Sequence, residues 1–210
     1  IAADIKRYLK SINPEVLLIR EEYTDHLYEG NWDSSWGHRF LTAARDWYNN
    51  TNSAEELVSR LNNSNYRLPR PIALSMYNHY DQHDFNRLYN DTKEELVKIN
   101  AVQILLMTYI GSPCLYYGDE VGVTNMTTDG EQAQNRNSFN WDESSWNYSV
   151  YNMQKALGQL RQDYNSTLKT GILKMGKADN AKQTVEFGRW DGKNTVITKL
   201  NKSNNTYTED

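Results

Sequence analysis

Short apolar runs alternate with helical patterns along this chain, and each run ends abruptly in polar or ionisable residues. The clearest run, Ile72 to Met76, leads directly into YNHYDQHDFNR at Tyr77 to Arg87. An apolar run of this length predicts a buried strand that delivers polar side chains beyond its end. Similar runs occupy residues 16–19 and 113–117. Strands that alternate with helices predict parallel β/α units.

The helical patterns between these runs set the size of the predicted fold. We expect helices over residues 1–12, around 40–47, after capping boxes at 53–56 and 92–95, and around 150–160. Another short strand is possible between Trp32 and Trp36. About four β/α units result, which is half of an eight-stranded TIM barrel; a small open α/β sheet is the competing architecture. From Gly171, alternating runs predict an antiparallel β appendage, so we expect two regions, 1–170 and 171–210.

Composition narrows the function classes. The net charge is −4, and the basic residues are scattered, so nothing favours nucleic-acid binding. No apolar run approaches the roughly 20 residues of a membrane-spanning helix. The one cysteine, Cys114, excludes an internal disulfide and a Cys-based metal cluster, and no other ligand cluster is visible. The 15 Tyr and 6 Trp residues, against 4 Phe, offer flat faces with polar edges that suit sugars, although most of them must pack the core.

Carboxylates follow several of the predicted strands. Glu21, Asp84 and the pair Asp119 and Glu120 each come after the carboxyl end of an apolar run. In a β/α barrel these ends converge on one face, which carries the site. Two convergent carboxylates can divide the work of glycoside hydrolysis, one as a proton donor and one as an ionised group. A single carboxylate at such a position could equally be a helix cap or a solvated loop charge.

Four segments carry a family resemblance. YNHYDQHDFNR resembles the seventh-strand motif of the alpha-amylase family, glycoside hydrolase family 13. The other three, at residues 17–25, 109–123 and 135–142, are LLIREEYTD, YIGSPCLYYGDEVGV and NRNSFNWD. They resemble the fifth strand, the last strand and the stretch after that strand. The four occur in the family's order, and the chain is most similar to the neopullulanase and maltogenic amylase types.

The resemblance implies roles for individual residues. Glu21 would be the general acid/base, and Asp84 would hold substrate hydroxyls and stabilise the transition state. His83 would donate a hydrogen bond to the sugar, with Arg136 and Tyr23 as supporting substrate contacts. Two further expectations concern the rim of the barrel: Tyr117 and Asp119 would shape it, and Arg87 would form a structural ion pair there. The chemistry needs no metal or cofactor, although calcium is possible in a longer parent protein.

The resemblance also implies that this chain is only part of an enzyme. The family's nucleophilic Asp lies on the fourth barrel strand, which would precede Ile1. We therefore expect the C-terminal half of a retaining alpha-glucan hydrolase that acts on starch, maltodextrin or related oligosaccharides. The isolated chain would be inactive and could self-associate through the open half-barrel. The chain departs from the family's motifs at Arg20, Tyr23, Gln82 and Phe85, so the resemblance fixes neither the substrate preference nor the activity.

Two other functions remain open on the sequence alone. A glucan transferase would share every one of these residues, because only the acceptor differs. A non-catalytic, carbohydrate-binding or transporter-associated homologue would keep the fold, but it would need neither Glu21 nor the pair of His83 and Asp84.

Overall fold

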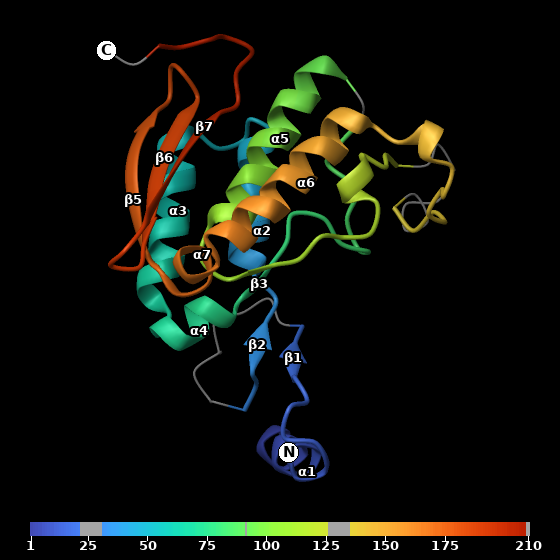
Figure 1. The fold of residues 1–210 in the computed structure, drawn as a ribbon, viewed down its shortest axis with the longest axis vertical. Coiled ribbons are helices and arrows are strands. Elements are labelled where there is room, and N and C mark those ends of the chain that lie inside the picture. Colours follow the sequence, from blue (N-terminus) through green and yellow to red (C-terminus); the bar gives the residue numbers. More distant parts are fainter. Residues whose placement is uncertain (22–30, 91, 126–134, 209–210) are drawn as a thin grey trace.

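The computed structural model describes residues 1–21, 31–90, 92–125 and 135–208 (Figure 1). It is an α/β fold in which short parallel strands and helices precede an antiparallel sheet. The helices are α1 (Ala2–Ile12), α2 (His38–Tyr48), α3 (Ala54–Arg67), α4 (Arg70–Ser75), α5 (Lys93–Thr108), α6 (Tyr148–Asp163) and α7 (Asn165–Thr170), with short 3-10 turns η2 (Asp119–Val121) and η3 (Glu143–Ser145). The strands are β1 (Ile19–Arg20), β2 (Ser34–Ser35), β3 (Tyr77–Asn78), β4 (Ser112–Pro113), β5 (Ile172–Asp179), β6 (Thr184–Trp190) and β7 (Thr195–Asn201).

The first four strands lie side by side in chain order and run parallel. β1 pairs with β2 through Ile19 and Ser34, and β3 pairs with β4 through Tyr77 and Ser112. A single parallel bridge between Trp36 and Tyr77 joins the two pairs. Helices α2, α3 and α4 connect β2 to β3, and α5 connects β3 to β4. The polar residues that follow these strands therefore emerge at one edge, as the sequence pattern predicts.

The predicted strand over Ile72 to Met76 is wrong. Arg70–Ser75 form the short helix α4, with Pro71 in its first turn, and the strand begins only at Tyr77. Proline suits that position because its fixed φ matches a helix and its missing N–H would have no partner there. Five apolar residues are too few for periodicity to separate a buried strand from a buried helix.

The other two predicted strands exist but are shorter and less buried than expected. β1 starts at Ile19, so Val16 to Leu18 precede it, and β4 ends at Pro113. In the first run only Leu18 is buried, whereas the side chain of Leu17 is 71% exposed and Ile19 is 41% exposed. The run is apolar on both faces, as a strand covered on both sides would be, but only one face is covered by the described residues.

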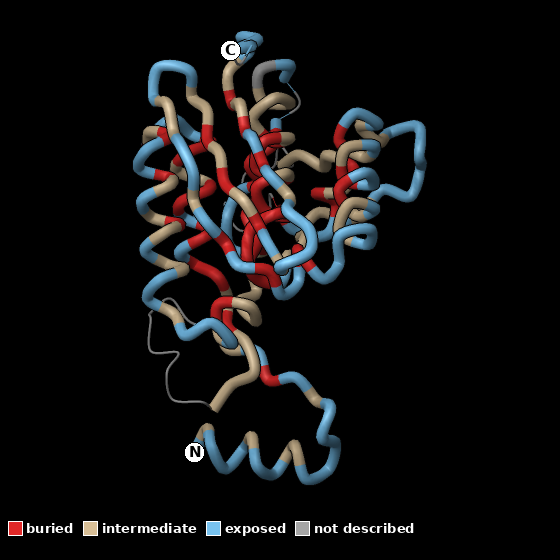
Figure 2. The backbone as a smooth tube through the Cα atoms, turned by 60° about the vertical axis from the view of Figure 1, so that its left-hand side comes forward, coloured by how far each residue is buried: buried red, intermediate tan, exposed pale blue. Residues whose placement is uncertain are grey.

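The predicted helix starts are confirmed. Ser53 Oγ accepts a hydrogen bond from Glu56 N, and Thr92 Oγ1 accepts one from Glu95 N, both at 3.1 Å. These are the N-terminal halves of the two capping boxes. Helix α1 also forms as predicted, and Pro14 follows its end, but none of its residues is buried (Figure 2).

The main core lies between helices α2, α3 and α5 and the inner face of the sheet β5–β7 (Figure 1). The predicted antiparallel appendage is confirmed: β5 pairs with β6, and β6 with β7. Phe187 and Leu200 of this sheet belong to the same apolar cluster as Trp47, Leu57 and Leu105 of the helices. Among the described residues, no helix combines the length and apolarity that a membrane span requires.

Candidate active site

Glu21, His83 and Asp84 come together at the carboxyl ends of the parallel strands. Glu21 directly follows β1, whereas His83 and Asp84 lie in the loop after β3. One side-chain nitrogen or oxygen of each residue lies within 4.8 Å of those of the other two. Glu21 is exposed, and the side chains of His83 and Asp84 are 43% and 38% exposed. Glu21 is far from His83 and Asp84 in the sequence, and parallel strand order brings them together.

Arg136 completes this group. Its Nη2 donates to Asp84 Oδ1 at 2.9 Å, and its Nε donates to the carbonyl oxygen of His83 at 2.9 Å. His83 Nε2 lies 3.3 Å from the same Asp84 oxygen. A guanidinium on a carboxylate forms a charge-assisted hydrogen bond, which fixes the position of that carboxylate.

Buried charges hold the loop that carries His83 and Asp84. Asp81 accepts hydrogen bonds from Leu88 N, and Arg45 Nη1 lies 2.6 Å from Asp81 Oδ1. Burial raises the pKa of Asp81 to about 6, against the opposing field of Arg45. Asn135, next to Arg136 in the chain, donates from Nδ2 to the carbonyl of Gln82 at 3.1 Å. The loop and the segment at 135–136 are thereby tied to each other.

Sequence reasoning missed these supporting residues. Asp81 lies inside the YNHYDQHDFNR segment, shortly before the pair of His83 and Asp84. This position was the signal that the sequence offered. Arg45 carries no such signal, because it lies on the amphipathic helix α2, far from Asp81 in the sequence.

The expected ion pair of Arg87 forms, but it is buried rather than at a rim. Arg87 Nη1 lies 3.2 Å from Asp119 Oδ1, and the two side chains are 0% and 3% exposed. Burial and the nearby Asp81 raise the pKa of Asp119, which Arg87 opposes. The guanidinium also lies over the rings of Tyr116 and Tyr117. The expectation that Asp119 shapes the rim is therefore wrong. Its carboxylate is buried, where it neutralises the charge of the buried Arg87 guanidinium.

A pocket of about 190 Å³ opens beside His83. Its lining includes Trp36, Tyr77, His79, Gln82 and Cys114. The edge of the Trp36 indole contacts both imidazoles, with ring centroids 5.2 Å from His79 and 5.9 Å from His83. Burial lowers the pKa of His79 to about 4, so this imidazole is neutral at physiological pH.

Tyr23 lies outside the described residues, so the structure gives it no position. Glu21, His83 and Asp84 each place one side-chain nitrogen or oxygen within 4.8 Å of the others, and the expectation that the site uses no metal stays a prediction. The pattern could not be read from the sequence, because the residues come from two distant segments.

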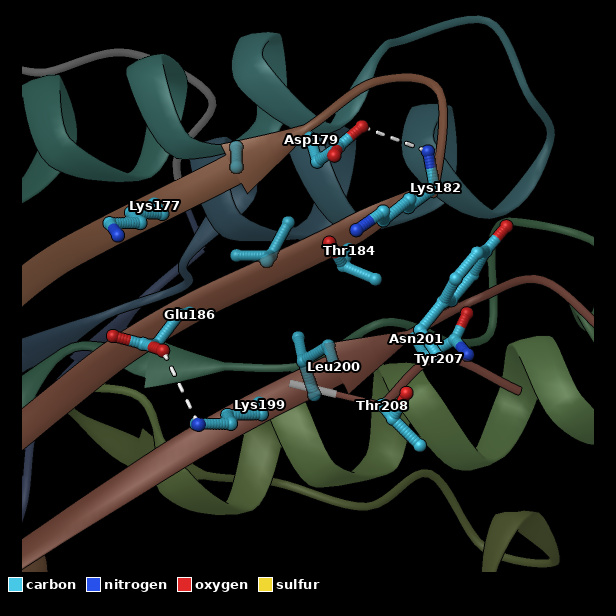
Figure 3. A pocket seen from close by; sticks show the side chains of 12 residues that line it. Lys177, Asp179, Lys182, Thr184, Glu186, Lys199, Leu200, Asn201, Tyr207 and Thr208 are labelled. Carbon is cyan, nitrogen blue, oxygen red and sulfur yellow. Dashed lines mark hydrogen bonds and ion pairs between the residues drawn. The ribbon is translucent and has the colours of Figure 1, made fainter. Parts of the chain in front are cut away.

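A larger hollow, of about 580 Å³, lies on the β5–β7 sheet (Figure 3). Lys177, Lys182 and Lys199 line it with Asp179, Glu186 and Tyr207. Lys199 pairs with Glu186 at 3.8 Å, and the ammonium of Lys182 lies over the Tyr207 ring. None of the residues that line this hollow belongs to the group around Glu21.

Comparison with known proteins places these features in a family. The chain is 27% identical over 205 residues to a cyclomaltodextrinase of Geobacillus thermopakistaniensis, covering 96% of this chain and 34% of that protein. It is 24% identical to a maltogenic alpha-amylase of Bacillus acidopullulyticus, covering 97% of this chain and 35% of that protein. The chain thus spans about a third of the length of these curated relatives.

Solved structures agree on the fold. The structure of a maltogenic amylase from S. marinus aligns with all of this chain and 30% of its own, at a TM-score of 0.84 and 24% identity. A cyclomaltodextrinase structure aligns with 95% of this chain and 34% of its own, at a TM-score of 0.83 and 25% identity. The sequence model of the alpha-amylase catalytic domain matches residues 2–174. Residues 2–174 correspond to part of the alpha-amylase catalytic domain, and this chain therefore belongs to the alpha-amylase family.

Proposed function

We propose that this chain is the C-terminal half of the (β/α)8 catalytic barrel of a retaining alpha-glucan hydrolase. Its residues 171–210 begin a small antiparallel β domain, the first part of a sandwich. The parallel order of β1 to β4 supports the half-barrel, because neighbours in a TIM barrel follow the chain. The observation that carries the function is the meeting of Glu21, His83 and Asp84 at the strand ends, with Arg136 on Asp84.

The proposed substrate is an alpha-glucan, such as starch, maltodextrin or a related oligosaccharide. The named relatives include cyclomaltodextrinase, maltogenic alpha-amylase and neopullulanase, which supports this class. Glu21 protonates the glycosidic oxygen as the bond to the sugar carbon breaks. A carboxylate nucleophile, which lies outside these 210 residues, forms the bond to that carbon. Glu21 then takes a proton from water as the water displaces the nucleophile.

The remaining residues position the sugar. Asp84, held by Arg136, accepts hydrogen bonds from ring hydroxyls and stabilises positive charge at the reacting carbon. His83 donates to a neighbouring hydroxyl, and Arg136 balances the charge of Asp84 so that two carboxylates can lie close together. Tyr23 would provide an aromatic face near Glu21. None of these steps requires a metal or a cofactor.

Exposed apolar residues support the view that another part of the barrel covers this chain. Ile5, Tyr8 and Ile12 of α1 are 45% to 66% exposed, and Leu17 and Ile19 around β1 are also exposed. Such a patch normally contacts a partner, because soluble chains rarely leave apolar residues grouped in water. We propose that the isolated chain self-associates through this surface and the open edge of β1.

Reconstitution tests the proposal. The 210-residue chain alone should release no reducing sugar from maltoheptaose above a Glu21→Gln control, because the nucleophile is absent. Added to a separately produced N-terminal half of the barrel, the unmodified chain should restore hydrolysis, and the Glu21→Gln chain should not. Turnover by the isolated chain that exceeds the Glu21→Gln control would overturn the proposal, and so would equal activity of the two reconstituted mixtures.

A further inference from the structure

Trp141 presents a large aromatic ring to solvent on the segment that carries Arg136. It is 81% exposed, more than any of the other five tryptophans of the chain. Trp141 follows Arg136 by five residues, so their Cα atoms lie at most about 18 Å apart. In Figure 1 the segment around η3 projects beyond the start of α6. Soluble proteins keep few such rings in water beyond those that bind something, so this exposure indicates a ligand.

Four further rings join Trp141 in one cluster. The ring centroid of Phe139 lies 4.6 Å from that of Trp141 and 6.0 Å from that of Trp146. Tyr151, on α6, lies 5.7 Å from both Trp146 and Tyr148 by the same measure. We call these five residues the aromatic platform. It connects the exposed indole of Trp141 to a helix of the fold, so the ring is supported although most of its surface faces water.

Hydrogen bonds fix the backbone on both sides of Trp141. The backbone N–H of Asp142 donates to Asn140 Oδ1 at 3.0 Å, and the indole N–H of Trp146 donates to the carbonyl oxygen of Asn140 at 3.0 Å. Asp142 Oδ1 in turn accepts a hydrogen bond from Ser144 N at 3.0 Å. A ligand that meets Trp141 therefore finds a segment that is already ordered, which lowers the entropy cost of binding.

A glucose ring has the chemistry that this surface fits. One face of a pyranose ring carries C–H groups, which the negative face of an aromatic ring attracts, and its edges carry hydroxyls. Ser138 and Asn140 are exposed beside the rings and offer a hydroxyl and an amide. Both side chains are uncharged, so they can exchange water for sugar hydroxyls without the cost of desolvating an ion.

We propose that the aromatic platform is a surface site that binds an alpha-glucan chain through Trp141, outside the group of Glu21, His83 and Asp84. This inference rests on the substrate class of the proposed function and adds a second contact with that substrate. A long glucan held at the platform stays near the strand ends, because the second contact is made within one complex. The site thus favours polysaccharides over short oligosaccharides, which cannot span both places.

Electrophoresis of the 210-residue chain through native gels with and without soluble starch tests the proposal. Starch should retard the unmodified chain. Trp141→Ala should raise the Kd for starch at least about tenfold, the scale of one lost aromatic contact, and Trp141→Phe should lie between because it keeps a flat ring. Trp190→Ala and Trp190→Phe are the matched controls, since Trp190 is also exposed, at 51%, but lies on β6; both should bind starch normally.

Two results on the isolated chain would overturn the proposal: no retardation of the unmodified chain by starch, or equal retardation of Trp141→Ala. Far-UV circular dichroism checks folding. If Trp141→Ala does not fold, the comparison of Trp141→Phe with Trp190→Phe decides, and equal Kd values for that pair would overturn the proposal.

The same gels distinguish a glucan from the other occupant of this surface, the missing part of the barrel. With the N-terminal half added to a Glu21→Gln chain, which prevents hydrolysis, the dependence of retardation on Trp141 should persist. Its disappearance would show that the N-terminal half covers Trp141 and would also overturn the proposal. Hydrolysis of maltoheptaose by the reconstituted mixture tests the proposed function separately, so either proposal can fail without the other.

Discussion

Arg136 Nη2 lies 2.9 Å from Asp84 Oδ1, and Arg136 Nε donates to the carbonyl oxygen of His83. One guanidinium therefore holds both members of the adjacent pair. The segment that carries Arg136 is itself tied to the same loop through Asn135. The site depends on this cross-link between the loop after β3 and the segment at 135–136, because neither has regular secondary structure.

Removal of this guanidinium should impair the site without unfolding the chain. In the proposed enzyme, reconstituted from this chain and an N-terminal half of the barrel, Arg136→Ala should lower kcat/KM roughly ten- to a hundredfold, the scale of a lost hydrogen bond to a charged group. Arg136→Lys should have a kcat/KM between those of the unmodified protein and Arg136→Ala, because lysine keeps the positive charge but not the planar guanidinium that donates two hydrogen bonds. Arg7→Ala is the matched control, because it removes an exposed arginine whose ion pair, with Asp4, lies within α1. Equal kcat/KM for Arg136→Ala and Arg7→Ala would contradict this role.

The buried pair of Arg87 and Asp119 should be the most sensitive charge interaction in the fold. Arg87→Met leaves a buried carboxylate beside Asp81 and should reduce the free energy of unfolding by about 3–5 kcal/mol. Arg60→Met is the control, because Arg60 and Asp46 are about 40% exposed and such a pair contributes about 0–1 kcal/mol. Urea unfolding of the 210-residue chain measures both. If Arg87→Met reduces the free energy of unfolding by no more than Arg60→Met does, the buried pair is not the more sensitive interaction and the prediction is refuted.

The docking of α1 should depend on pH through Asp33. Burial alone would raise the pKa of Asp33, but the hydrogen bond from Leu18 N and the ammonium groups of Lys6 and Lys10 outweigh it and lower the pKa to about 2. A lowered carboxylate pKa contributes stability that is present above the ordinary value near 4 and is lost as the pH falls towards 2. Lys6 and Lys10 are on α1, so acid should release this helix first.

Hydrogen exchange of the α1 amides measures this effect. Their protection should fall between about pH 4 and pH 2 in the unmodified chain. In Asp33→Asn it should already be low at pH 6 and should change little with acid. Asp4→Asn is the control, because Asp4 pairs with Arg7 and with the amino group of Ile1, and its ion pairs reach no other part of the described chain. The account fails here if Asp33→Asn keeps the protection of the unmodified chain at pH 6.

The sequence predicted the features that local chemistry decides. Capping boxes at Ser53 and Thr92 and the alternation in β6 and β7 depend on neighbouring residues, and the structure has them. The resemblance in motif order predicted which distant residues meet. It could not predict that residues 70–75 are helical, because five apolar residues carry no usable period. Nor could it show that Asp119 is buried, since its partner Arg87 comes from a different loop.

The β5–β7 sheet should be necessary for the folding of residues 1–170. Arg189 of β6 is fully buried, and its guanidinium donates to the carbonyl oxygens of Tyr109 at 2.8 Å and Gly171 at 3.0 Å. It thereby satisfies the C-terminal end of α5, whose last carbonyls have no partner within the helix. Burial lowers the pKa of Arg189 to about 10, so the group stays charged at neutral pH.

Arg189→Met should therefore reduce the free energy of unfolding by about 1–3 kcal/mol for each buried carbonyl left unpaired. Arg161→Met is a partial control, because Arg161 donates to a single carbonyl, that of Met107. A chain truncated after residue 170 should lose cooperative unfolding altogether, because Phe187 and Leu200 leave the core. A soluble 1–170 chain with a sharp unfolding transition would show that the sheet is dispensable.

The most direct measurement of the central claim compares Glu21→Gln with its neighbour Glu22→Gln in the protein that contains both barrel halves. If Glu21 is the general acid, Glu21→Gln should lower maltooligosaccharide hydrolysis by roughly a hundredfold or more, whereas Glu22→Gln should change it only slightly. With a maltosyl fluoride, whose leaving group needs no protonation, Glu21→Gln should recover much of its first-step rate. A severe loss of hydrolysis in Glu22→Gln, with a normal rate of hydrolysis in Glu21→Gln, would contradict the assignment of Glu21 as the general acid at the end of β1.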